Sequence, residues 1–281
     1  SQVAKVANAS TGAFDTMDEA ISAAVLAQVQ YRHCSMQDRA SFINGIRDVF
    51  LQEDVLCALS RMAVEETGMG NYEDKLIKNR VAALKTPGIE DLTTSAVSGD
   101  GGLTLIEYSA FGVIGSITPT TNPTETIINN SIGMLAAGNT VVFSPHPRSR
   151  KVSLYAVELI NNKLAQLGAP ANMVVTVTKP SIDNTNVLIN DPRINMLVAT
   201  GGPAIVKTVM SSGKKAIGAG AGNPPAVVDE TADIEKAARD IIKGCRQQPA
   251  VRGGKRGDCC EPGSGLSDSL HEEKRCLSVV R

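Results

Sequence analysis

The sequence has few aromatic residues and almost no excess charge of either sign. Trp is absent, and aromatic residues make up 3% of the 281 residues. Lys and Arg number 28 against 29 Asp and Glu, which gives a formal net charge of −1. This balance gives no electrostatic reason to expect nucleic acid or an anionic membrane surface as a partner. No apolar run is long enough to span a bilayer, so we expect no membrane partner.

The cysteines form no recognisable pattern. They are Cys34, Cys57, Cys245, Cys259, Cys260 and Cys276, and no two of them have CxxC spacing. This arrangement favours neither a disulfide framework nor a zinc site, so we expect no metal and a reducing compartment. The first residues lack the apolar core of a secretory signal, which favours the cytoplasm.

The N-terminal part of the chain has helical patterns. Residues 16–31 predict an amphipathic helix, and Thr16 with Glu19 fits a capping box at its start. A second helical stretch is predicted over 36–66, followed by two glycines that permit a tight turn.

The residues after this stretch predict less regular structure. We interpret 65–70 as a packed helix end and the charged residues 73–75 as a solvated surface. Residues 90–102 are polar and Gly-rich, which is typical of a loop, and 103–107 alternate like a strand.

From residue 111 the pattern changes to alternating strands and helices with short connections. Strands are predicted at 111–118, 141–144, 173–178, 194–200 and 226–228, and helices at 123–138, 149–167, 181–190, 203–212 and 231–243. Such alternation indicates an α/β fold with a doubly wound, parallel, Rossmann-like sheet. No internal repeat is evident.

We divide the chain accordingly. The expected parts are 1–102, a helical part; 103–110, a strand; 111–228, the Rossmann-like core; 229–245, the start of a second domain; and 246–281, an aberrant tail. Because the tail contains no Phe, Tyr, Ile or Met and no sustained apolar period, it is not expected to fold.

Two motifs carry a family resemblance. The run Gly112-Val-Ile-Gly-Ser-Ile-Thr-Pro-Thr-Thr-Asn-Pro-Thr-Glu125 and the Gly-rich run 218–233 resemble the aldehyde dehydrogenase superfamily, over residues 15–244. Where most hydrolytic members have a glutamate base, Ala219 stands here. That exchange is similar to the CoA-acylating branch, the propionaldehyde and acetaldehyde dehydrogenases of bacterial microcompartments for propanediol and ethanolamine utilisation.

The resemblance implies a reaction. A cysteine thiolate attacks an aldehyde, NAD accepts the hydride, and coenzyme A takes up the acyl group as co-substrate. The implied partners are a small aldehyde and CoA, with a homo-oligomer in the intact family member. The resemblance also implies that 1–102 belong to the cofactor domain, that 103–110 form a strand of an oligomerisation hairpin, that 111–228 bind NAD, and that 229–245 begin the catalytic domain. The implied location is the bacterial cytoplasm or the lumen of a microcompartment.

Asn122 is the expected catalytic residue. It matches the family asparagine whose amide stabilises the developing oxyanion, and Thr118, Pro119 and Thr120 are its expected neighbours beside the cofactor. Without the resemblance, an Asn in a Thr-Asn-Pro turn would be taken as a cap of the following helix.

Further cofactor residues are expected at other strand ends. Glycines after a strand let backbone N–H groups approach a pyrophosphate, and ligands bind at the carboxyl edge of such sheets. The expected residues are Thr200, Gly201 and Gly202, Ser144 and His146, and Gly218, Ala219 and Gly220. The alternatives are an ordinary tight turn at 200–202, a solvent-facing histidine at 146, and close packing of chain segments at 218–220.

The nucleophile is the missing part. Cys245, Cys259 and Cys260 stand in contexts unlike the family's, so we expect no nucleophilic Cys and no turnover. Codons for 246–255 read one base later can encode Asp-Asn-Asn-Leu-Pro-Cys-Val-Ala-Glu, which resembles the family's nucleophile segment and suggests a frameshift; a genuine divergent tail is the alternative. The other functions considered are an inactive NAD-binding module, a partner of full-length subunits, and a glutamyl-phosphate reductase relative, which fits the motifs less well.

Overall fold

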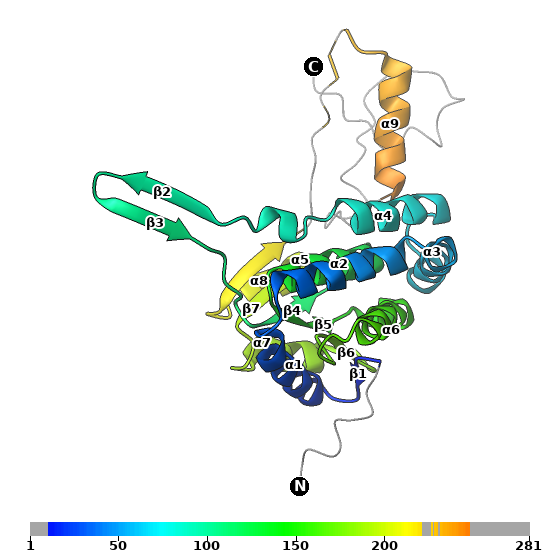
Figure 1. The fold of residues 1–281 in the computed structure, drawn as a ribbon. Helices are drawn as coiled ribbons and strands as arrows, with labels where there is room; N and C mark the ends of the chain where they lie inside the picture. Colours follow the sequence, from blue (N-terminus) through cyan, green and yellow to red (C-terminus); the bar gives the residue numbers. More distant parts are fainter. Residues whose placement is uncertain (1–10, 221–225, 227, 230, 248–281) are drawn as a thin grey trace.

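The computed structural model describes residues 11–220, 226, 228–229 and 231–247 (Figure 1). Its first elements are β1 Ala13–Phe14, α1 Met17–Tyr31, α2 Met36–Phe50, α3 Glu53–Thr67 and α4 Tyr72–Lys85. The predicted capping box of α1 is confirmed, since Thr16 and Glu19 exchange both hydrogen bonds. The predicted single stretch over 36–66 is wrong, because the chain turns extended at Gln52 (ψ 131°) and starts a new helix there.

A parallel sheet forms the centre of the molecule. In the described part of the chain it has six strands in the order β1-β6-β5-β4-β7-β8, and all neighbours run parallel. The central strands are β4 Val113–Ile117, β5 Thr140–Ser144, β6 Val174–Val177, β7 Met196–Thr200 and β8 Lys215–Ala219. The doubly wound α/β class is thereby confirmed.

The last strand differs from the prediction. Ala226 and Val228 belong to no strand in the structure, and Lys215–Ala219 is the strand that follows α8. The Ala-Val-Val run at 226–228 has the higher strand propensity, but β8 pairs with β7 along all five of its residues.

Helices connect the strands and cover both faces of the sheet. They are α5 Pro123–Ala136, η3 Pro147–Ser149, α6 Arg150–Gln166, α7 Ile182–Asn190 and α8 Pro203–Met210. Pro123 begins α5 as expected, and the left-handed Gly138 (φ 81°) follows its end. The later helix α9, Ile234–Gln247, passes through Gly244, so the expected stop at that glycine is wrong.

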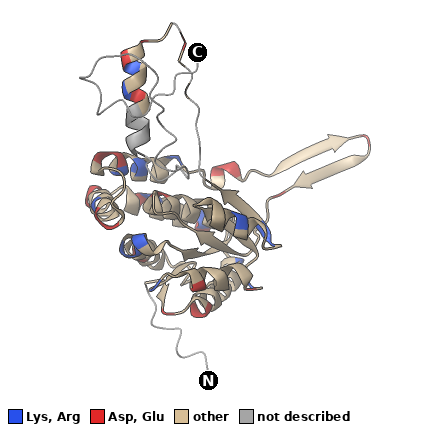
Figure 2. Cartoon of the chain, turned by 180° about the vertical axis from the view of Figure 1, so that it is seen from behind, with Lys and Arg blue, Asp and Glu red and all other residues tan. Residues whose placement is uncertain are grey.

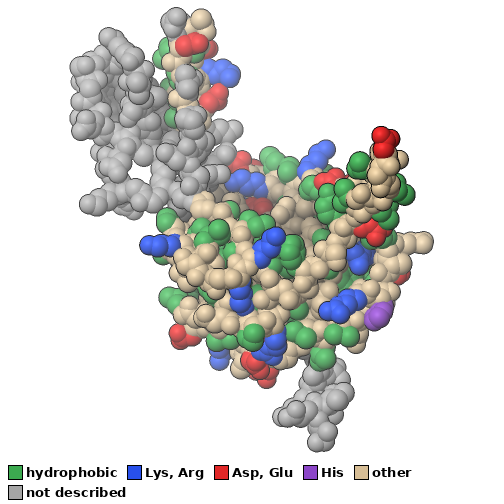
Figure 3. All heavy atoms as spheres, turned by 90° about the vertical axis from the view of Figure 1, so that its left-hand side faces the viewer, with side chains coloured by type: hydrophobic (Ala, Val, Ile, Leu, Met, Phe, Trp, Pro, Cys, Tyr) green, Lys and Arg blue, Asp and Glu red, His purple; other side chains and the backbone are tan. Residues whose placement is uncertain are grey.

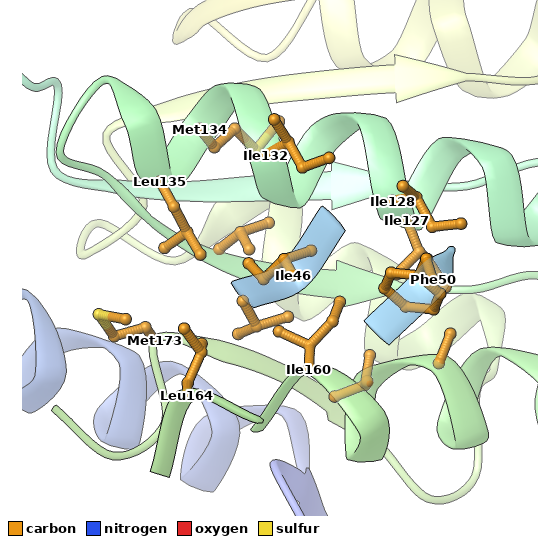
Figure 4. Packing of buried hydrophobic residues seen from close by; sticks show 14 of the residues in the cluster. Ile46, Phe50, Ile127, Ile128, Ile132, Met134, Leu135, Ile160, Leu164 and Met173 are labelled. Carbon is orange, nitrogen blue, oxygen red and sulfur yellow. The ribbon is translucent and has the colours of Figure 1, made fainter. Parts of the chain in front are cut away.

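The core lies in two layers, one on each face of the sheet. On one face α2, α5 and α6 pack together, and Ile46, Phe50, Ile127, Ile128 and Ile160 are each at most 1% exposed (Figure 4). On the other face a second cluster joins residues of α1, α7 and α8 to the strands. Burying each such side chain contributes about 1.5–3 kcal/mol, so these layers fix the sheet and its strand ends.

A hairpin projects from this body (Figure 1). It consists of β2 Ser95–Gly99 and β3 Gly102–Ile106 in antiparallel pairing, and every residue of both strands is exposed. The expected strand at 103–107 is confirmed within one residue. The expected loop over 90–102 is wrong for Ser95–Gly99 and for Gly102, which are in strands, and its first two residues belong to the short 3-10 helix η2 Ile89–Asp91.

Candidate functional site

The strand order reverses beside β4. The chain passes from β4 to β5 and β6 on one side, and then crosses to β7 and β8 on the other. Ile117 is in register with both Ser144 and Ala199, so the loops that follow β4, β5 and β7 leave the sheet together. Ligands of open α/β sheets bind at the carboxyl edge, at such a reversal. The expected residues 118–120, 122, 144, 146 and 200–202 lie on these loops or, for 144 and 200, at the strand ends that precede them.

Asn122 stands directly before α5 but does not use its side chain as a helix cap. Its backbone carbonyl accepts hydrogen bonds from the N–H and Oγ1 of Thr126, whereas the amide Oδ1 lies 3.4 Å from Lys75 Nζ. The capping alternative therefore does not describe what the Asn122 side chain does.

Lys75 enters this site from α4 and is almost completely buried, with 1% of its surface exposed. Its Nζ donates to the carbonyl oxygen of Thr121 at 2.5 Å and to Glu125 Oε1 at 2.9 Å. Burial lowers the pKa of Lys75, and the neighbouring carboxylate of Glu125 acts in the opposite direction. The expected solvated surface at 73–75 is therefore wrong for Lys75.

One signal in the sequence could have revealed this lysine. Lys75, Asn79 and Ala83 recur at a spacing of four residues and are the buried positions of α4. A helix buries residues three or four apart on one face, so a lysine in phase with Ala83 indicates a buried ammonium group.

Thr118 joins the first two loops. Its N–H donates to the carbonyl oxygen of Ser144 at 3.2 Å, and Thr118 as a whole is 3% exposed. Its Oγ1 is buried and has no hydrogen-bond partner within the described structure. Pro119 and Thr120 beside it are half-buried. A buried hydroxyl without a partner at this edge is a free donor for a bound ligand.

The loop after β5 holds Ser144 and His146. The Ser144 hydroxyl is buried and lies 2.8 Å from the hydroxyl of Thr185 on α7. His146 is exposed, and its Nδ1 accepts a hydrogen bond from the N–H of Arg148 at 3.1 Å. Burial and then the charge of Arg148 lower the pKa of His146. Because Nδ1 accepts this hydrogen bond, a neutral ring carries its proton on Nε2, which remains available as a donor.

The end of α3 supports this loop. The Glu66 carboxylate accepts hydrogen bonds from the N–H groups of Lys151 at 2.7 Å and Val152 at 2.9 Å, at the start of α6. The carbonyl oxygen of Thr67 accepts from Arg148 at 2.8 Å. The segment 65–70 is thus a packed helix end, as expected, and it also anchors the loop that holds His146.

The loop after β7 leads into α8. The N–H of Gly201 donates to the carbonyl oxygen of Ala219 at 3.2 Å, and Gly202 precedes Pro203 without a side-chain cap. A side chain at Gly202 would meet no atom within 4 Å. Thr200 is half-buried and pairs with Ala219 at the end of β8.

Gly218 and Gly220 have different surroundings. A Cβ on Gly218 would lie 2.7 Å from Val206 Cγ1 and 3.1 Å from Met210 Cγ, because α8 crosses β8 at this point. A Cβ on Gly220 would meet nothing within 4 Å. Gly218, Ala219 and Gly220 are all exposed, but only Gly218 lies so close to α8 that an added Cβ would clash, which favours close packing of chain segments at that position.

The cysteines lie away from these loops as far as the structure describes them. Cys34 follows α1, Cys57 lies within α3, and both are half-buried free thiols. Burial raises the pKa of Cys34. The Cys245 side chain, Cys259, Cys260 and the tail after residue 247 lie outside the described residues, as do 221–225 of the Gly-rich run.

The described residues contain neither a candidate metal cluster nor a candidate membrane span. No group of three or more His, Cys, Asp or Glu side chains there could hold a metal ion. No helix in that part of the chain has the length and apolar character needed to cross a bilayer.

Curated relatives share this sequence pattern. The chain is 54% identical over 233 residues to propanal dehydrogenase (CoA-propanoylating) of Citrobacter freundii, covering 83% of this chain and 50% of that protein. It is 46% identical over 234 residues to acetaldehyde dehydrogenase (acetylating) EutE of Escherichia coli K12, covering 83% of this chain and 49% of that protein. The chain thus spans about half the length of these relatives.

Solved structures share the fold. A propionaldehyde dehydrogenase of Rhodopseudomonas palustris with bound CoA and an acylated cysteine has a TM-score of 0.82 and 72% identity, covering 86% of this chain and 55% of that one. An engineered glycolyl-CoA reductase with bound NADP+ has a TM-score of 0.81 and 72% identity, covering 84% and 53%.

A third solved structure comes from a microcompartment. It is a propionaldehyde dehydrogenase from the fucose utilisation bacterial microcompartment of Clostridium phytofermentans, with a TM-score of 0.79 and 54% identity, covering 83% of this chain and 53% of that one. The model of the aldehyde dehydrogenase family matches residues 1–248. The chain therefore belongs to the aldehyde dehydrogenase family.

Proposed function

We propose that residues 11–220 form the NAD-binding part of a CoA-acylating aldehyde dehydrogenase that oxidises a short aldehyde, propionaldehyde or acetaldehyde, to its acyl-CoA. One observation carries the proposal: three strands end in register at the reversal of the parallel sheet, and Asn122 and most candidate cofactor residues lie at these strand ends or on the loops that follow them. The names of the relatives support the aldehyde and CoA as substrates, and propionaldehyde stands first because the propanal enzyme is the more similar of the two relatives compared.

The residues at this edge suit a dinucleotide. Thr118 offers a buried hydroxyl without a partner, and Gly202 leaves open space before α8, whose first N–H groups favour an anion. His146 Nε2 is placed to donate to ribose or adenine from the loop after β5. The bound nicotinamide would supply the hydride acceptor; the chain's own residues bind it and fix its position.

Asn122 would act on the aldehyde oxygen. An amide N–H aimed at the oxygen where negative charge develops stabilises the transition state by roughly 3–4 kcal/mol in comparable sites. Ala219 provides no carboxylate base at the carboxyl edge. A thiol acceptor needs less base assistance than water, because part of it is already thiolate near neutral pH.

Titration with NAD and NADP tests the proposal. We expect the chain to bind NAD in isothermal calorimetry, and the NADP+-bound neighbour makes NADP the necessary comparison. NADH formation, followed by absorbance with propionaldehyde and CoA present, then measures turnover. Because no nucleophile is expected in this chain, binding without turnover agrees both with the proposal and with the alternative of an NAD-binding module or a partner of full-length subunits. Turnover would contradict the expected loss of the nucleophile. Absence of binding to either dinucleotide would contradict both proposals.

The absence of a nucleophile remains part of the proposal. The matched family segment ends at residue 248, close to where the sequence loses the family's pattern. Resequencing codons 240–281 tests the frameshift: one inserted or deleted base should restore Asp-Asn-Asn-Leu-Pro-Cys. An unbroken frame would favour the NAD-binding module.

We also propose a homo-oligomer joined through the hairpin β2–β3. Leu103, Leu105 and Val97 are 70%, 60% and 61% exposed on it. Both strands are coloured tan in Figure 2, because they contain no Lys, Arg, Asp or Glu, and Figure 3 shows apolar side chains along them. The cytoplasm or a microcompartment lumen is the proposed location, supported by the origin of the Clostridium relative.

A further inference from the structure

The three acceptors around Lys75 account for all of its donors. An ammonium group has three N–H donors and no acceptor. The Thr121 carbonyl oxygen, Glu125 Oε1 and Asn122 Oδ1 lie 2.5, 2.9 and 3.4 Å from Nζ. The Lys75 ammonium group is buried and has no acceptor atom, so a hydrogen-bond donor facing it would be electrostatically unfavourable.

This arrangement decides which way the Asn122 amide points. Oxygen and nitrogen of a side-chain amide are distinguished by their hydrogen-bond partners. Rotating the amide by half a turn would set its NH2 group against the ammonium of Lys75, which places donor against donor. The oxygen must therefore face Lys75, and the two Nδ2 hydrogens point away from it.

We propose that Lys75 is a positioning residue that holds the Asn122 amide with its Nδ2 hydrogens free to donate to the substrate oxygen. This inference rests on the proposed role of Asn122. It adds that the donor depends on a charge carried by another helix, α4, which is separated from Asn122 by 47 residues of sequence.

Burying the Lys75 ammonium group costs free energy, and an apolar side chain of the same size would fill this space without that cost. Removing a lysine from water is unfavourable, and apolar residues often replace buried ion pairs without loss of stability. Glu125, whose Oε2 also accepts from Thr124 at 3.1 Å, compensates part of that cost. A methionine of similar length would fill the space, but it could not select the orientation of the amide.

The test observes Asn122 directly. The protein is labelled with 13C-asparagine and observed by NMR. The signal of Asn122 Cγ is identified as the one that disappears in the variant Asn122→Ser. In Lys75→Met we expect this signal to move upfield, because the amide oxygen loses its donor. In the control Lys85→Met, an exposed change on the same helix, the signal should stay in place. An unmoved Asn122 signal in folded Lys75→Met would overturn the proposal.

A second measurement covers the case in which Lys75→Met does not fold. In the unchanged chain, raising the pH removes the Lys75 proton, and the Asn122 Cγ signal should titrate with the same midpoint as the Lys75 Cε signal. Different midpoints would refute the inference. Neither readout requires turnover, so both can be made on a chain without a nucleophile. A failed catalytic role of Asn122 would appear separately, as NADH formation that Asn122→Ser leaves unchanged in the chain whose restored reading frame supplies the nucleophile.

Discussion

Gly218 has no side chain because α8 passes over the strand at that point. A methyl group there would lie 2.7 Å from Val206 Cγ1, closer than such groups approach in folded proteins. Gly218→Ala should therefore destabilise the chain by about 1–3 kcal/mol through overpacking. Urea unfolding followed by circular dichroism measures the loss.

Gly220→Ala is the matched control, since its added methyl meets nothing within 4 Å. We expect it to change the free energy of unfolding by less than about 0.5 kcal/mol. Equal effects of the two substitutions would mean that packing against α8 does not explain Gly218.

Asp191 makes a pH-dependent contribution. Its Oδ1 accepts from the backbone N–H and Nε of Arg193, both at 2.9 Å, and its Oδ2 accepts from Nη2 at 2.5 Å. Hydrogen bonding from Arg193 lowers the pKa of Asp191. A lowered carboxyl pKa stabilises the fold above the unfolded-state value, and this stabilisation is lost as the pH falls through the folded-state value.

Asp191→Asn should accordingly cost roughly 1.5–3 kcal/mol at pH 7, the range for hydrogen bonds to charged groups. The difference in free energy of unfolding between this variant and the unchanged chain should stay constant down to about pH 5 and become smaller below about pH 4. Urea unfolding at a series of pH values measures it, with the exposed Asp48→Asn as control. A difference that persists unchanged into acid would argue against the ion pair.

Single residues were predictable only where a motif or a turn specifies them. The family motif singled out Asn122, but its partner Lys75 was taken for a surface charge. Pairing of Lys75 with Glu125 brings together residues 50 positions apart, and charge in a sequence does not reveal such a partner. Gly218 was equally ambiguous. A glycine required by the close approach of a ligand cannot be distinguished in sequence from one required by the close packing of a helix.

At the scale of elements, the start of α1 offers a clean comparison. Thr16 Oγ1 accepts from the N–H of Glu19, and Glu19 Oε2 accepts from the N–H of Thr16, both at 3.2 Å. Thr16→Ala should cost about 1 kcal/mol, the usual loss of a helix cap. Gln52 precedes α3 without a side-chain bond, so Gln52→Ala should have almost no effect. Thermal unfolding of both variants measures the contrast; similar losses would show that the box contributes nothing.

Elements with a strong local signal were predicted well. Pro123 marks the start of α5, and Val113–Ile117 forms a completely buried strand because its five residues all pack between layers. Strand β8 was missed, since Lys-Ala-Ile-Gly-Ala has little strand propensity. Its conformation comes from pairing with β7 and from α8 lying over Gly218, which are tertiary contacts.

For the whole molecule, alternation of strands and helices was enough to predict the doubly wound sheet, because right-handed crossovers allow few topologies. The hairpin follows a different rule. An isolated two-stranded hairpin is marginally stable in water and needs a further surface to pack against. Within the described part of the chain, its two outer edges pair with no other strand, and such edges can join another chain.

The hairpin therefore predicts self-association. Leu103 and Leu105 lie on one face, and replacing both with lysine should shift the chain toward monomer in sedimentation velocity experiments, because two charges would be buried in the contact. Ser95→Lys with Thr104→Lys places the same charges on the opposite face and serves as control. Association that survives Leu103→Lys with Leu105→Lys would place the contact elsewhere. If the two double variants reduce self-association equally, the effect is due to added charge or to a contact that uses both faces of the hairpin. The control face also exposes apolar surface, at Val97 and Ile106.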